Sequence, residues 1–86
     1  MSIGEVKAAL GEASQLLDQG RTTVESVGDS LNEAAGLMLA TLHDSQRDEA
    51  AKARKAVTEA MREVKLTLRA VTAAQESGNE FGKALG

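Results

Sequence analysis

The fold is decided by residues 3–41, IGEVKAALGEASQLLDQGRTTVESVGDSLNEAAGLMLAT. Apolar and small residues recur here with spacings that alternate between three and four. One row holds the larger side chains, Ile3, Leu10, Leu17, Val24, Leu31 and Met38. The other row holds mostly small ones, Val6, Ala13, Gly20, Val27, Ala34 and Thr41. This heptad pattern predicts a long helix that packs along its whole length on another helix.

A second segment repeats the pattern after a polar run. Its central row is Ala50, Val57, Val64 and Val71, flanked by Ala53, Ala60, Thr67 and Ala74 on one side and by Met61 and Leu68 on the other. Serine followed three residues later by an acid predicts a helix start at Ser2 and again at Ser45. Gly78 predicts a helix end. We therefore expect one all-α domain, with a helix over about 2–43, a turn over about 43–47, a helix over about 46–77 and a short tail, 78–86.

A turn this short makes the two helices an antiparallel hairpin, in which the numbers of contacting residues sum to about 91 or 92. Large side chains then meet small ones at most levels. The predicted seam consists of Leu10, Leu17, Gly20, Val24, Val27, Leu31, Ala34, Val57, Met61, Val64, Leu68 and Val71. Gly20 should face Val71, so leucine at Gly20 should overpack the seam. A break and restart at Gly28 is the alternative to one continuous first helix, but the heptad register runs through it and favours continuity, with any bend located there.

Composition excludes several classes of protein. The 86 residues include no cysteine, no proline and one aromatic residue, Phe81, and the net charge is −3. A disulfide scaffold and a thiolate metal site are therefore excluded, and the acidic balance argues against nucleic-acid binding. No apolar run reaches the ~18 residues that a membrane span needs, and residues 1–5 do not begin a cleavable signal peptide. We expect a cytoplasmic protein, or one secreted without such a signal.

Chemistry-bearing residues are sparse. His43 is the only histidine, and Asp44 and Asp48 are near it, so a divalent-cation site is one interpretation and an ordinary helix terminus is the other. No set of nucleophile, base and acid can be assembled, and no phosphate-binding loop follows a strand. We expect no catalysis, no cofactor and no small-molecule substrate.

Five leucines lie outside the predicted seam and would remain in water in an isolated hairpin. They are Leu16, Leu37, Leu39, Leu42 and Leu66. Leucine, unlike alanine, is not explained by helix propensity alone, so we expect these side chains to be buried against a second chain. The expected partner is the protein itself or a similar helical hairpin, in a four-helix bundle.

These features resemble the small Trp-x-Gly proteins of bacterial type VII secretion, the early-secreted-antigen type. Those proteins are short helical hairpins with a central turn, no signal peptide and a tendency to pair into four-helix bundles. At the matching turn this chain has residues 43–45, His-Asp-Ser, and Phe81 is followed four residues later by Leu85 where the family has tyrosine followed by an acid. The resemblance implies an interaction module similar to type VII substrates or their partners. The alternative is a cytoplasmic coiled-coil adaptor or a chaperone-like protein.

Overall fold

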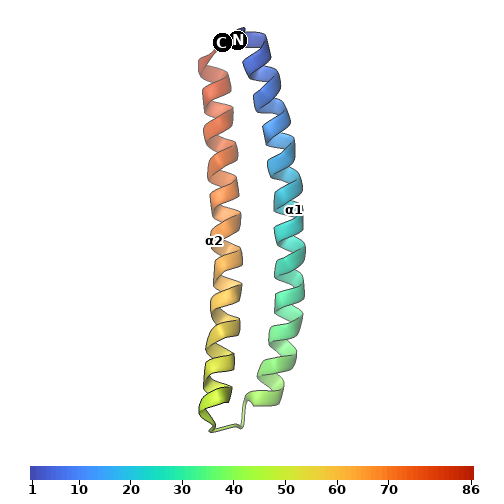
Figure 1. The fold of residues 1–86 in the computed structure, drawn as a ribbon, viewed down its shortest axis with the longest axis vertical. Coiled ribbons are helices and arrows are strands. Elements are labelled where there is room, and N and C mark those ends of the chain that lie inside the picture. The colour runs from blue at the N-terminus through green and yellow to red at the C-terminus, as the bar shows by residue number, and fades with distance from the viewer.

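The computed structural model describes all 86 residues as two helices joined by a short turn. Helix α1 spans Ile3–Leu42 and helix α2 spans Asp48–Ala84. The helices run antiparallel and side by side, so that both chain termini lie at one end of a rod measuring 63 × 16 × 15 Å (Figure 1). There is no strand. The predicted all-α hairpin is confirmed.

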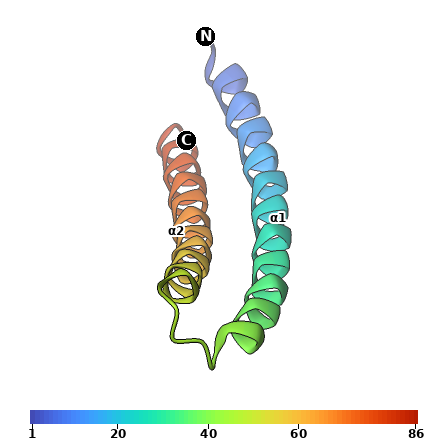
Figure 2. The same cartoon turned by 60° about the horizontal axis from the view of Figure 1, so that its bottom comes forward.

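Helix α1 begins and continues as its sequence predicts. The Ser2 hydroxyl accepts a hydrogen bond from the main-chain N–H of Glu5 at 3.1 Å, which satisfies one of the free donors at the helix start. No proline interrupts the helix, and it passes through Gly28 without a break. Figure 2 shows α1 as one continuous, gently curved helix.

Loss of this cap is a first test of the fold. We expect Ser2→Ala to lower the free energy of unfolding by about 1 kcal/mol, because the N–H of Glu5 loses its acceptor. Urea denaturation followed by circular dichroism measures the change. Ser26→Ala is the matched control, since Ser26 lies inside α1, is exposed and caps nothing. Equal stability of the two variants would show that the cap contributes nothing.

Helix α2 differs from expectation at both ends. Its N-cap is Arg47, which makes no side-chain capping bond, so the predicted capping box at Ser45 does not form. The Ser45 hydroxyl instead accepts from the N–H of Arg47 at 3.3 Å. The predicted end near residue 77 is also wrong, because Gly78 remains helical and α2 continues to Ala84 alongside the first turns of α1. The glycine that takes positive φ is Gly86, at 96°.

Two close approaches fix the register of the hairpin. A methyl group at Gly28 would lie 3.2 Å from Val64 Cγ1, and one at Gly82 would lie 3.7 Å from Leu10 Cδ1. The numbers in each pair sum to 92, which agrees with the predicted register. At the open end, Gly82 meets Leu10.

The seam contains one displaced row. Val27 is 48% exposed and Ala34 is exposed, whereas Gly28 contacts Val64 and Ala35 is only 3% exposed. The prediction that Val27 and Ala34 belong to the seam is therefore wrong by one residue.

The other predicted seam positions are half-buried, and all except Gly20, which lies in the same row as Val27 and Ala34, face the opposite helix. They are Leu10, Leu17, Gly20, Val24, Leu31, Val57, Met61, Val64, Leu68 and Val71. A methyl group at Gly20 would meet nothing within 4 Å, so the structure gives no support to the predicted overpacking at that position.

The hairpin has almost no interior. Only Ala35 and Ala50 are buried, and no large side chain is fully enclosed. Two helices in contact cover one stripe each, which leaves the remaining surface of both helices in solvent. Nine large apolar side chains are consequently exposed, among them Leu16 at 60% and Leu37 at 71%.

Candidate helix-docking face

A second heptad row runs along α1 beside the seam and away from α2. Its members have spacings that alternate between four and three, which keeps them on one side of a helix with about 3.6 residues per turn. They are Ala9, Ala13, Leu16, Gly20, Thr23, Val27, Ser30, Ala34, Leu37 and Thr41. None carries a charge, and all except the half-buried Gly20 are exposed.

Helix α2 carries a corresponding row. It consists of Ala53, Ala56, Ala60, Glu63, Thr67, Ala70, Ala74, Ser77 and Phe81. Glu63 is its only charged member. In an antiparallel pair of helices, flanks with the same angular offset from the seam lie on the same side. The two rows therefore form one surface along the rod, which we call the charge-poor face.

Threonine hydroxyls on the charge-poor face need no external partner. Thr23, Thr41 and Thr67 each donate to the main-chain carbonyl oxygen four residues earlier, at 3.1, 2.8 and 2.9 Å. A hydroxyl that is satisfied by its own helix leaves the threonine methyl group as the contact surface. These positions can be buried against another helix without leaving a polar group unpaired.

Polar contacts between the helices gather on the opposite side, which we call the charged face. Arg21 Nη2 donates to Thr72 Oγ1 at 2.8 Å and to Gln75 Oε1 at 2.7 Å. Gln75 Nε2 donates in turn to Asp18 Oδ1 at 2.7 Å. Farther along, a small groove of about 220 Å³ is lined by Glu25 and Lys65, among others. The charged face thus ties the two helices together, and its acids and bases point away from the charge-poor face.

The five predicted partner residues do not form one surface. Leu16 and Leu37 lie on the charge-poor face. Leu39 is 38% exposed and is two residues from Leu37, which places it toward the charged face. Leu42 is half-buried at the end of the seam, where its carbonyl accepts from Arg54 Nη1 at 2.9 Å. Leu66 is 39% exposed on the side of α2 turned away from α1.

Two large apolar members of the charge-poor face lie outside the five predicted partner residues. Val27, at 48% exposure, and Phe81, at 53%, are its other large apolar side chains. They can be found in the sequence by counting alternately three and four residues from Leu16 on α1 and from Ala53 on α2. Each count gives a row of residues that is separate from the seam.

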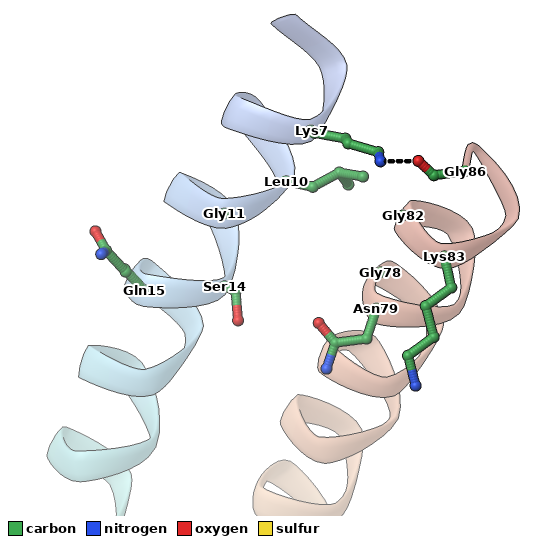
Figure 3. Close-up of a pocket in the computed structure, with 10 residues that line it drawn as sticks. All are labelled: Lys7, Leu10, Gly11, Ser14, Gln15, Gly78, Asn79, Gly82, Lys83 and Gly86. Carbon is green, nitrogen blue, oxygen red and sulfur yellow. Dashed lines mark hydrogen bonds between the residues drawn. The ribbon is translucent and has the colours of Figure 1, made fainter. Parts of the chain in front are cut away.

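A second feature is the groove at the open end, shown in Figure 3. It has a volume of about 760 Å³ and lies between the first turns of α1 and the last turns of α2. Lys7 Nζ donates to the main-chain oxygen of Gly86 across it. Its walls are polar side chains and glycines, with Leu10 as the one apolar side chain. Such an open, polar trough lacks the enclosed apolar lining typical of a ligand pocket.

No metal site is assembled. No group of three or more His, Cys, Asp or Glu side chains is placed to hold an ion. At the hairpin tip, His43 Nε2 lies 3.1 Å from Asp44 Oδ2, and His43 Nδ1 lies 2.8 Å from the carbonyl of Ala40. The structure therefore shows His43 in local contacts at the end of a helix.

Comparison of the chain with protein-family models, with curated proteins and with solved structures gave no significant match. Neither α1 nor α2 contains a stretch that is both long enough and apolar enough to cross a membrane. The charge-poor face is the feature from which a function can be argued.

Proposed function

We propose that the chain is a non-catalytic protein–protein interaction module that binds other helices through the charge-poor face. The observation that carries this proposal is the uninterrupted row of ten uncharged residues along α1, exposed over nearly its whole length. Surface helices normally place charged residues on the side turned away from their neighbour. The charges of this α1 flank the row but do not enter it.

The small size of the interior supports the same proposal. Only two alanines are buried, so an isolated hairpin has little burial with which to offset the conformational entropy lost on ordering 86 residues. Small chains without disulfides or metals commonly complete their core by association. The charge-poor face offers that completion, because it continues the apolar stripe of the seam around each helix.

The composition of the face indicates the kind of partner. Alanine, glycine, serine and threonine dominate both rows, and small side chains let a second helix approach closely. A partner with a similar pair of small-residue helices would give a four-helix bundle. The type VII hairpin proteins also pair into four-helix bundles, and the proposal therefore extends to export by that route.

Site-specific photo-crosslinking tests the proposed function. We expect a benzoylphenylalanine at Leu37 to give covalent adducts in the cells that make the protein, because Leu37 is the most exposed leucine of the charge-poor face. The same probe at Leu39, two residues away and outside that face, should give none above background. Adducts of equal yield at both positions, or at neither, would contradict a face-specific interaction module.

A further inference from the structure

We infer that the partner is a second copy of this chain, docked face to face with the two hairpin tips at opposite ends of the bundle. A two-fold axis would cross the rod at the level of Glu25 on α1 and Thr67 on α2. This inference rests on the proposed function and specifies its partner and geometry. In the resulting bundle each α1 lies against the other α1, and each α2 against the other α2.

The row on α1 is symmetric about its own centre. A two-fold axis at residue 25 pairs every member of the row with another member in the second copy, and the two residue numbers of each pair sum to 50. The pairs are 9 with 41, 13 with 37, 16 with 34, 20 with 30 and 23 with 27. Leu16 then meets Ala34 of the second copy, and Leu37 meets Ala13. Large side chains oppose small ones at both levels, as close packing of two helices requires.

The same axis crosses the row on α2 at Thr67. Thr67 would face Thr67 of the second copy, Ala60 would face Ala74, and Ala53 would face Phe81, each pair summing to 134. Residues whose numbers sum to 92 lie at the same level of the hairpin, as the contact of Gly28 with Val64 shows. Residues 25 and 67 sum to 92, so one axis passes through both helices at that level.

Charges at the edges of the α1 pair distinguish this arrangement from the one with both tips together. With the tips at opposite ends, Glu33 lies near Gln19 of the second copy and Glu12 lies near Ala40. Asp18, Glu25 and Asp29 are on the charged face and point away.

The edges of the α2 pair agree. Lys52 lies near Glu80 of the second copy, which is an opposite-charge pair, and Leu66 meets Leu66. This contact gives a partner to the one exposed leucine of α2, which no contact within the hairpin explains.

With the tips together, α1 would lie against the partner's α2 instead. Glu12 would then oppose Glu80, and Glu33 would oppose Glu59, because both pairs sum to 92. Like charges that face each other across two helices are destabilising and commonly select against an alternative pairing. Glu63, within the α2 row, lies near Ala70 of the second copy in the proposed arrangement, where a small neighbour leaves its carboxylate a route to solvent.

The face is large enough for a stable dimer. A rod 63 Å long and 16 Å wide presents a side of about 1,000 Å², and a typical stable interface buries about 800 Å² per partner.

Single-cysteine crosslinking tests the geometry cleanly, because the chain has no cysteine of its own. We expect Thr67→Cys to form an intermolecular disulfide rapidly under mild oxidation, since residue 67 faces itself across the axis. Thr58→Cys is the matched control. Thr58 is an exposed threonine of the same helix, nine residues away and therefore on the opposite side, and it should crosslink only slowly.

Three outcomes would overturn the inference. Equal crosslinking at residues 58 and 67 would show random collision. A mixture of Thr67→Cys and Val27→Cys proteins that crosslinks to each other, while Thr67→Cys alone does not, would show that the tips lie together. A monomer in sedimentation equilibrium across the micromolar range would exclude a second copy as partner. In these last two cases, face-specific photo-crosslinks at Leu37 would still support the proposed function. The experiments therefore distinguish a failure of the proposed function from a failure of the dimer geometry.

Discussion

Gly28→Leu is expected to lower the free energy of unfolding by about 1–3 kcal/mol, the usual cost of overpacking a close helix contact. Gly28 is a close contact between α1 and α2, because even a methyl group there would lie 3.2 Å from Val64 Cγ1. A leucine must displace Val64 or push the helices apart. Leucine's better helix propensity, worth about 1 kcal/mol over glycine, offsets only part of this.

Gly36→Ala is the control for that prediction. A methyl group at Gly36 would meet nothing within 4 Å, and the residue has ordinary helical φ. We expect this variant to be more stable than the parent by about 1 kcal/mol, because alanine forms helix better than glycine. Both free energies should be measured by urea denaturation at one fixed protein concentration, since association would make stability depend on concentration. A Gly28→Leu protein as stable as Gly36→Ala would show that the hairpin seam does not pass through Gly28.

The heptad identified the hairpin and its register, but it misplaced part of the seam, for a physical reason. A heptad pattern reflects the hairpin contact together with any surface that packs on a partner, whereas the hairpin alone shows one contact. Val27 and Ala34 fit the heptad and yet are exposed. The apolar stripe of α1 is centred between the direction of α2 and the charge-poor face, as it would be for a helix with two neighbours.

Other differences arise from local signals that tertiary packing overrides. Ser77, Gly78 and Asn79 have the composition of a helix end, but α2 passes through them because it runs beside α1 to the end of the hairpin. Ser45 has the spacing of a capping residue, but the turn uses its hydroxyl elsewhere.

Side-chain size alone does not identify a docking surface. Leu39 and Leu42 are as large as Leu16 and Leu37, but their positions around α1 place them on different sides. The angular position of each residue was available from the sequence. The direction of α2 relative to the second row, which separates the charge-poor face from the charged face, came only from the structure.

The double variant Leu16→Glu/Leu37→Glu is expected to raise the dissociation constant of the dimer by at least about 1,000-fold. Each buried leucine contributes about 1.5–3 kcal/mol, and every 1.4 kcal/mol changes a dissociation constant about tenfold. In the proposed dimer the two substitutions remove four leucine contacts, and they place carboxylates against Ala34 and Ala13 of the second copy. The variant should remain helical, because both positions are exposed in the hairpin and glutamate forms helix well.

Leu39→Glu is the control for this last prediction, since Leu39 lies toward the charged face, outside both rows. It should dimerise as the parent does. Sedimentation equilibrium across the micromolar range gives the dissociation constants, and circular dichroism of the same samples reports whether helix is retained. If the double variant dimerised as well as Leu39→Glu, the charge-poor face would not be the contact surface. If Leu39→Glu were the one that dissociated, the two chains would have to meet through the charged face, and the polar contacts of Arg21 and Gln75 would have to rearrange to allow it.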